Sequence, residues 1–386
     1  MTMLNTKRIQ NAQDRMKQQG IDAYLILTHD DYIYFFGEDR YQPRAILPAE
    51  GLPLVVTFAG EEEEVRASLG VEDVRIFASV GQQIKDVVQV MRGMIGDKEK
   101  LKVGVQMWFG TPAFLLNMFQ RANPIVEVVD IAPVMDELRM VKDASEIALM
   151  QRASEIAGIG METAAKTLRA GITENEVAAE VEYAMRKAGG HGVATPVFVN
   201  SGIRSGWLHG TASEKVIENG DLVVLDLVPR CKGYCANLCR TFVIGEPSAK
   251  QADMFATYKT AQAAGIAALK PGTKMRDIDA AAKAVFTENG YGEFYVAGIS
   301  HSIGLSFEET PAPTIHPGDS GIQIRDGMTV TVGHPVLSVP GTGGVRLEDT
   351  FHISKGVGQL LTVFPSELEL PPLSHDALQT HKNTIH

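Results

Sequence analysis

Cysteine and tryptophan are scarce in this sequence, which has three cysteines and two tryptophans among 386 residues. Three cysteines in a chain of this size cannot form a disulfide framework, a pattern typical of a reducing compartment. Basic residues are fewer than acidic ones: the sequence has 36 lysines and arginines and 47 aspartates and glutamates. The net charge of −11 argues against a nucleic-acid partner, since a broad basic surface is needed to release counterions from phosphates.

Long apolar runs are absent as well, and no apolar stretch of the sequence is long enough to cross a bilayer. The first twenty residues alternate charged with apolar side chains and lack a secretory apolar core. We therefore expect a cytoplasmic protein that does not bind membranes. Hydrophobic residues make up 45% and charged residues 22% of the chain, which is typical of a globular protein.

The length and the changing periodicity predict two domains. Up to about residue 135, helical spacing alternates with short apolar runs such as "DAYLILT", "LPLVVTF" and "KVGVQMW", which indicates a small α/β domain over residues 1–135. From residue 140 to 386, helix pairs alternate with antiparallel strands, which predicts an α+β domain whose sheet is covered by helix pairs. Thr173 followed by Glu176 is typical of a capping box at the start of one of these helices.

The three cysteines lie four residues apart in "CKGYCANLC", as Cys231, Cys235 and Cys239. On a helix this spacing would align three thiols as a soft-metal site. The flanking residues are strand-like, however, and a strand would separate Cys235 from Cys239 by roughly 13 Å, too far for a disulfide or a shared ion. We expect the cysteines to pack as small apolar side chains.

Several polar residues occur in strand-like segments of the second domain, where burial without partners would be costly. Because strands present alternate residues to one face, such side chains can converge from distant parts of the chain. Their nitrogen and oxygen donors suit Mn, Fe, Co or Zn. The candidates are Asp226, Asn237, His301, His334 and Glu348.

The second domain contains, in this order, "ELRMVKDASEIALMQRA", "SGIRSGWLHG", "LDLVPRCKGYCANLCRTF", "HSIGLSFEETP", "DGMTVTVGHP" and "GGVRLEDTFHIS". This set resembles the pita-bread hydrolases, which include prolidases, Xaa-Pro aminopeptidases, methionine aminopeptidases and creatinases. The N-terminal "DDYIYFFGEDRYQPRAILPAEGLPLVV" is similar to the smaller α/β domain of prolidases and creatinases. The resemblance covers nearly the whole chain and implies a C-terminal pita-bread fold and a homodimer.

The metallopeptidases of this family bind two divalent ions with two aspartates, one histidine and two glutamates. By the resemblance, Asp226 matches the first aspartate, His301 the histidine and Glu348 the last glutamate.

Two positions of the metal-binding pattern differ. The second aspartate falls on Asn237. The first glutamate falls on His334, whereas counting from "DGM" gives Gly333, so a one-residue insertion or bulge is implied. Only two of four carboxylates remain to neutralise two divalent ions. We therefore expect at most one ion (Mn, Fe, Co or Zn) or none.

Creatinases work without a metal, and a histidine in their "SG…H" segment acts as general base and acid. His209 matches that histidine, and we expect it to transfer protons in this protein. Asp226 and Glu348 complete the predicted catalytic set, because they would hold either the ion or the polar groups of the substrate.

Substrate contacts are expected at residues near these positions. Creatinases bind a guanidinium with two carboxylates, which fall on Cys239 and His334 here, so creatine is disfavoured. The "HE" pair of prolidases reads Glu308-Glu309. The residues predicted to contact the substrate are Trp207, Cys239, Glu308, Glu309 and Arg346.

These observations favour a hydrolase that cleaves a carbon–nitrogen bond of a small molecule and differs from the standard peptidases of the family. Three alternatives stay open. They are an Xaa-Pro peptidase with an unusual metal site, a lyase of the dimethylsulfoniopropionate type, and a catalytically inactive peptide-binding module such as those in histone chaperones.

Overall fold

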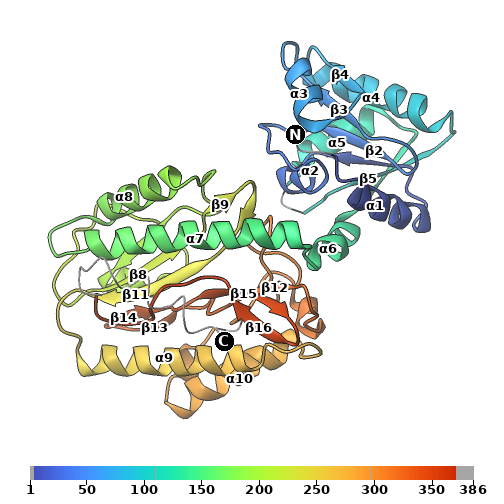
Figure 1. The fold of residues 1–386 in the computed structure, drawn as a ribbon. Coiled ribbons are helices and arrows are strands. Elements are labelled where there is room, and N and C mark those ends of the chain that lie inside the picture. The colour runs from blue at the N-terminus through green and yellow to red at the C-terminus, as the bar shows by residue number, and fades with distance from the viewer. Residues whose placement is uncertain (1–3, 109, 297, 371–386) are drawn as a thin grey trace. The chain divides into compact units, whose positions relative to one another are not determined.

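The computed structural model describes residues 4–108, 110–296 and 298–370 (Figure 1). The chain divides into two compact units, residues 1–141 and 142–386. In the described ranges, no helix combines the length and apolar composition that crossing a membrane requires.

The first unit alternates helices with the strands of one six-stranded sheet, whose order is β4-β3-β2-β1-β5-β6. Its elements are α1 (Thr6–Gln18), β1 (Ala23–Ile26), α2 (His29–Phe36), β2 (Ala45–Pro48), β3 (Leu54–Thr57), α3 (Glu62–Leu69), β4 (Val74–Ile76), α4 (Val80–Ile95), β5 (Leu101–Val105), α5 (Ala113–Ala122), β6 (Val126–Asp130) and α6 (Ala132–Met140).

Both faces of this sheet are covered by helices, as the side chains of strand β1 illustrate. Leu25 packs in a buried cluster with side chains of α4 and α5, such as Val87 and Phe119. Tyr24 points to the opposite face, where its hydroxyl donates to Asp31 of α2. The alternation follows from strand geometry and confirms an α/β character for this unit. The sequence pattern did not single out β2, a fully buried strand of four residues.

The second unit contains two helix pairs and several short antiparallel sheets. Its elements are α7 (Ala144–Thr167), α8 (Glu174–Lys187), β7 (Phe198–Ser201), the 3₁₀ helix η1 (Gly202–Gly206), β8 (Leu222–Leu227), β9 (Arg230–Cys231), β10 (Tyr234–Cys235), β11 (Leu238–Val243), α9 (Ala249–Ala267), α10 (Met275–Glu288), η2 (Gly292–Phe294), η3 (Pro317–Gly321), β12 (Thr329–Val332), β13 (Leu337–Val339), β14 (Gly343–Val345), β15 (Asp349–Ser354) and β16 (Val357–Leu360).

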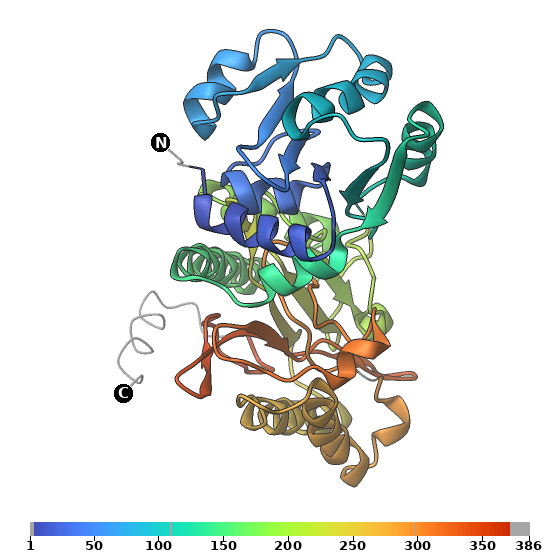
Figure 2. The ribbon, with the colours of Figure 1, turned by 90° about the vertical axis from the view of Figure 1, so that its right-hand side faces the viewer.

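In this unit the strands lie between the pair α7–α8 and the pair α9–α10 (Figure 1). Figure 2, turned by 90°, shows the long helices nearly end-on with strands between them. One sheet has the order β11-β8-β7 and another β12-β15-β16. This is the predicted α+β arrangement of an antiparallel sheet covered by helix pairs. The predicted capping box of Thr173 and Glu176 is present at the start of α8.

The strand register brings distant polar residues together. On the antiparallel pair β8 and β11, Asp226 lies opposite Cys239. Cys239 also forms a bridge with Glu348, whose backbone exchanges two hydrogen bonds with it. The two sheets therefore meet at Cys239, and residues separated by more than a hundred positions become neighbours.

A buried carboxylate holds the segment that follows β7. Glu174, at the first turn of α8, is fully buried. It accepts hydrogen bonds from the backbone N–H and hydroxyl of both Ser201 and Ser213. The guanidinium Nε of Arg204 lies 3.1 Å from the same carboxylate. Five donors thus converge on one side chain and fix both ends of the stretch 201–213.

We predict that Glu174→Ala lowers the free energy of unfolding by about 3 kcal/mol, because several buried donors and a cation lose their partner. Urea denaturation followed by circular dichroism measures this change. Glu182→Ala, on an exposed position of the same helix, is the matched control and should unfold like the unmodified chain. Equal stability of the two variants would contradict the role given to Glu174.

Candidate functional site

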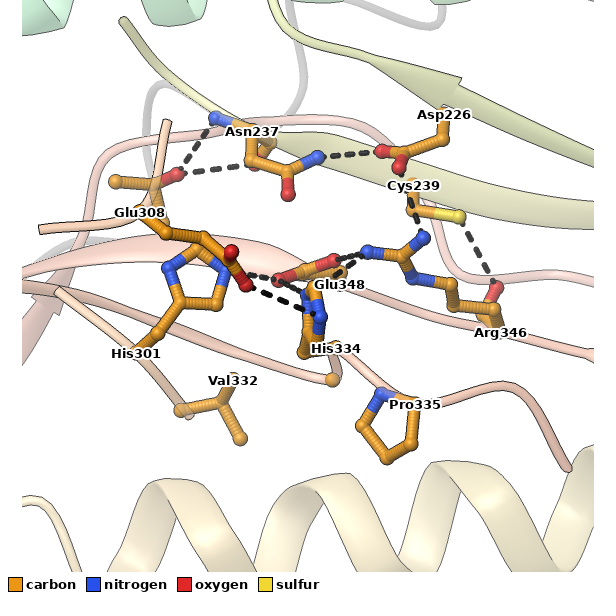
Figure 3. A network of polar contacts seen from close by, with 12 residues as sticks. Asp226, Asn237, Cys239, His301, Glu308, Val332, His334, Pro335, Arg346 and Glu348 are labelled. Atoms are coloured by element: carbon orange, nitrogen blue, oxygen red, sulfur yellow. Dashed lines mark hydrogen bonds and ion pairs between the residues drawn. The ribbon is translucent and has the colours of Figure 1, made fainter. Parts of the chain in front are cut away.

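Five predicted metal-site residues do converge in the second unit (Figure 3). Asp226 lies on β8, Asn237 directly before β11, His301 in the connection before β12, His334 after β12 and Glu348 directly before β15. All five side chains are buried. The ligand atoms of His301, His334 and Glu348 lie within 4.8 Å of one another.

Arg346 is the cation of this cluster. Its guanidinium Nη1 lies 2.9 Å from Oδ2 of Asp226, and its Nη2 pairs with Glu348. Only 2% of Arg346 is exposed. The two carboxylates raise the pKa of the guanidinium against the effect of burial, which acts to lower it. Arg346 was predicted to contact the substrate, but it is already paired on both sides by acidic groups of the protein.

Asn237 joins the same network from the other side. Its side-chain N–H₂ donates to Asp226, and its backbone N–H donates to the hydroxyl of Thr350 at 2.9 Å. The amide oxygen Oδ1 is buried and accepts no hydrogen bond from any residue that the structure describes. In Figure 3 this oxygen points toward Glu348. The amide therefore satisfies Asp226 but leaves one acceptor open to the centre of the cluster.

The hydrogen bonds of the two histidines define which nitrogens can bind a cation. Nδ1 of His301 lies 2.9 Å from the carbonyl of Ser302, which only accepts, so this nitrogen carries a hydrogen. Nε2 of His301 faces Oε1 of Glu348 at 3.4 Å. Neither atom has a hydrogen-bond partner in the part of the chain that the structure describes. These two atoms and Oδ1 of Asn237 are three buried polar atoms that need a cation or a donor.

His334 lies at the edge of this group. Its Nδ1 is 3.2 Å from Nη2 of Arg346, which only donates, so Nδ1 accepts. Nε2 then carries the hydrogen of the neutral ring and faces Oε1 of Glu308 at 3.3 Å. Burial lowers the pKa of His334, which favours this neutral form. A divalent ion would compete with Arg346 for Nδ1.

The electrostatics of the centre follow from burial and mutual pairing. Burial raises the pKa of Asp226, and Arg346 opposes that rise. Burial also acts to raise the pKa of Glu348, but Arg346 and the two histidines outweigh it and hold this pKa well below its usual range. For His301, burial acts to lower the pKa and Glu348 raises it by more. A proton and a metal ion therefore compete for Nε2 of His301.

The charges in the cluster match one divalent ion better than two. With neutral imidazoles, the carboxylates of Asp226, Glu348 and Glu308 carry three negative charges, and Arg346 carries one positive charge. One divalent ion would neutralise the remaining two negative charges, whereas two ions would leave a buried excess of positive charge. His301, His334 and Glu348 are a two-histidine, one-carboxylate set that could hold such an ion.

Gly333 and His334 form a β-bulge at the end of β12. The backbone N–H groups of both residues donate to the single carbonyl of Ile299. Gly333 has a φ of 126°, and a Cβ there would lie 1.7 Å from the carbonyl oxygen of Leu347. Only glycine fits at 333, and the side chain of 334 reaches the cluster. The bulge lies at the position where the two counts made from the sequence differ by one residue.

Trp207 and His209 lie in the stretch after η1. Trp207 is half exposed, and the guanidinium of Arg204 lies 4.5 Å above its ring. His209 is exposed and makes no hydrogen bond or ion pair with the described residues. Its predicted role in proton transfer stays a prediction.

Glu308 and Glu309, both predicted to contact the substrate, have different surroundings. Glu308 faces His334 and is 17% exposed at its side chain, so a small molecule could reach it. Glu309 is buried, lies 2.8 Å from Nζ of Lys142, and accepts hydrogen bonds from the backbone N–H groups of Leu305 and Ser306. Glu309 therefore holds the loop that carries Glu308.

The cysteines are all buried free thiols. Sγ of Cys239 lies 3.7 Å from the carbonyl of Arg346, and burial raises the pKa of this thiol well above its usual value. Cys239 was predicted to contact the substrate, but it is fully buried and lies between β8 and the segment of Glu348. It packs as a neutral side chain beside the charged cluster.

Fold and site together define a hydrolase with a prolidase-like architecture. Residues 148–355, more than half of the chain, match the family model described as Metallopeptidase family M24. Residues 8–141 match the Creatinase/Prolidase N-terminal domain. The chain belongs to metallopeptidase family M24, which confirms the predicted pita-bread resemblance and fold class.

Curated relatives and solved structures match over nearly the full length. The Xaa-Pro dipeptidase of Pyrococcus horikoshii is 30% identical, over 95% of this chain and 100% of its own. The uncharacterized peptidase YqhT of Bacillus subtilis is also 30% identical, over 94% and 99%. The structure of an Xaa-Pro dipeptidase from Bacillus anthracis superimposes with a TM-score of 0.84 at 29% identity, over 94% of this chain and 99% of that one.

Sequence reasoning missed two ion pairs of this region. Arg346 and Glu348 were both predicted site residues, but not as partners, although their spacing of two in an extended segment places both side chains on one face. Lys142 pairs with Glu309 across 167 positions, for which the sequence carries no local signal.

We predict that the chain, stripped with a chelator and dialysed against Mn²⁺, Co²⁺ or Zn²⁺, binds no more than one ion per chain. His301→Ala should abolish this binding, because Nε2 is one of the few donors. His352→Ala, which removes a half-buried histidine on β15, is the matched control and should bind like the unmodified chain. Two tightly bound ions per chain would refute the charge argument.

Proposed function

We propose that this chain hydrolyses a carbon–nitrogen bond of a small molecule at the cluster around Glu348, with one divalent ion or none. The observation that supports this most is the buried Arg346 between Asp226 and Glu348, together with an amide at position 237. These groups supply internally part of the positive charge that a second metal ion would provide. The reaction class follows from membership in family M24.

The proposed chemistry uses the open acceptors of the cluster. A divalent ion held by His301, His334 and Glu348 would supply Lewis acidity to a carbonyl and lower the pKa of water. Asp226 stays paired with Arg346 and keeps that guanidinium in place.

Substrate binding and proton transfer would fall to other residues. Glu308, which is the partly exposed acid, would accept N–H donors of the substrate. His209 would give a proton to the leaving nitrogen when the carbon–nitrogen bond breaks and water supplies the hydroxyl.

Hydrolysis of an Xaa-Pro bond is the second candidate, because a relative at 30% identity is named an Xaa-Pro dipeptidase. The altered positions 237 and 334 argue for a different or weaker activity. A panel of amides, amidines and Xaa-Pro dipeptides, assayed with and without Mn²⁺, Co²⁺ or Zn²⁺, separates the two candidates. Efficient Xaa-Pro turnover that disappears with a chelator would favour the second.

We further propose that the chain acts in the cytoplasm as a homodimer on a small-molecule substrate. Three free buried thiols support a reducing compartment. Light scattering after size-exclusion chromatography tests the dimer directly, and a monomeric mass at micromolar concentration would contradict it.

We predict that His209→Ala lowers kcat at least 100-fold on the best substrate of the panel, the usual range for a general acid or base. Ion content and unfolding should not change, because His209 is exposed and bonded to no described residue. His352→Ala serves again as the matched control. Full activity of His209→Ala would rule out its role while leaving the rest of the site untouched.

We also predict that Asn237→Asp combined with His334→Glu raises the ion content toward two per chain. The double substitution adds two carboxylates, which compensate a second divalent cation. Xaa-Pro hydrolysis should rise together with ion binding, as measured by equilibrium dialysis and product assay. Each single variant is the control and should stay at one ion or fewer. An unchanged ion content in the folded double variant would count against the charge argument.

A further inference from the structure

Helix α9 contacts the strand end that carries His334 through one polar face. Tyr258 and Gln262 lie four positions apart on α9, so their side chains share a face of the helix, and both are buried. Gly265 follows three positions further on the same face, and a Cβ there would lie 3.0 Å from Cγ1 of Val332. The missing side chain lets the helix approach the end of β12 closely.

The hydroxyl of Tyr258 bonds the carbonyl groups on both sides of His334. It lies 2.5 Å from the carbonyl oxygen of Gly333 and 2.6 Å from that of Pro335. A phenol has one hydrogen, so the two carbonyls share it. Burial raises the pKa of Tyr258 well above its usual value, so the hydroxyl keeps this hydrogen and acts as a donor.

Gln262 extends this support to the other side of the site. Its Nε2 donates to the carbonyl of Val332, the last residue of β12, at 3.0 Å, and to Oδ2 of Asp349 at 3.1 Å. Asp349 directly follows Glu348 in the sequence. Helix α9 therefore holds the backbone beside His334 and the residue next to Glu348 at the same time.

The carbonyl groups around His334 need this support because regular strand pairing stops at the bulge. Strand β12 ends at Val332, and Pro335 has no N–H with which to continue a ladder. In the described part of the chain, the carbonyls of Gly333 and Pro335 accept a hydrogen bond from Tyr258 alone. Loss of that hydroxyl would leave two buried acceptors unsatisfied and free the segment to move.

We infer that Tyr258, supported by Gln262, is a positioning residue for His334. By fixing the backbone on both sides of the imidazole, it keeps Nδ1 at 3.2 Å from Arg346 and Nε2 at 3.3 Å from Glu308. Figure 3 shows the ring of His334 between these groups, with Pro335 below it. The inference rests on the proposed function, in which His334 is one of the three groups that hold an ion.

The test is NMR of the histidine ring nitrogens in the full chain, after dialysis against a chelator and at one neutral pH. His334 should show one tautomer, with its hydrogen on Nε2 and two well-separated nitrogen signals, which are identified by their loss in His334→Gln. In Tyr258→Phe the ring should leave Arg346, so the two signals should move toward each other as the tautomers mix.

Ion affinity gives a second readout in the same preparations. Zn²⁺ binding, measured by equilibrium dialysis, should weaken about 10–100-fold in Tyr258→Phe, the usual effect of removing a group that orients a metal ligand. If the unmodified chain binds no Zn²⁺, the ring signals of His334 decide the outcome.

Tyr291→Phe is the matched control. Tyr291 is buried, and its hydroxyl donates at 2.5 Å to Asp253, which is also on α9. This change removes a comparable hydrogen bond that involves none of residues 332–335, so the His334 signals and the Zn²⁺ affinity should not change. Unchanged His334 signals in folded Tyr258→Phe, or equal shifts in both variants, would overturn the inference. If Tyr258→Phe does not fold, Gln262→Leu takes its place with the same criterion.

The ring signals are read without ion and without substrate, so they separate this inference from the proposed function. If no compound of the panel is hydrolysed but the signals still shift in Tyr258→Phe, the proposed function fails and the positioning of His334 stands. If hydrolysis is found and the signals do not shift, the positioning role alone fails.

Discussion

The ion pairs of Arg346 with Asp226 and Glu348 are the constraint on which the second unit depends. A guanidinium that is 98% buried is tolerated only when acidic groups compensate it, because an unpaired buried charge costs several kcal/mol. The two carboxylates belong to different segments, so the cation also joins β8 to the residues directly before β15. Its removal would leave two carboxylates facing each other in a region closed to water.

The same cation sets what the site can bind. Asp226 and Glu348 each commit one oxygen to Arg346, and Asn237 occupies the other oxygen of Asp226. What remains open is an oxygen of Glu348, a nitrogen of His301 and the amide oxygen of Asn237. A centre of three such acceptors suits one metal ion or a ligand rich in N–H groups. Its relatives share the scaffold at about 30% identity, but scaffold likeness does not fix chemistry.

The sequence predicted the features that depend on short-range pattern or on ordered motifs. The capping box of Thr173, the α+β class and the convergence of Asp226, His301 and Glu348 all followed from such signals. The pairing of Lys142 with Glu309 did not, because no local pattern links residues so far apart.

The bulge at Gly333 restricts how this site can change during evolution. A side chain at 333 would collide with the backbone of Leu347, so any substitution there would force the backbone to move. The side chain at 334 reaches the cluster without meeting that backbone. Substitution at 334 is therefore the sterically open way to exchange a group of the site at this strand end.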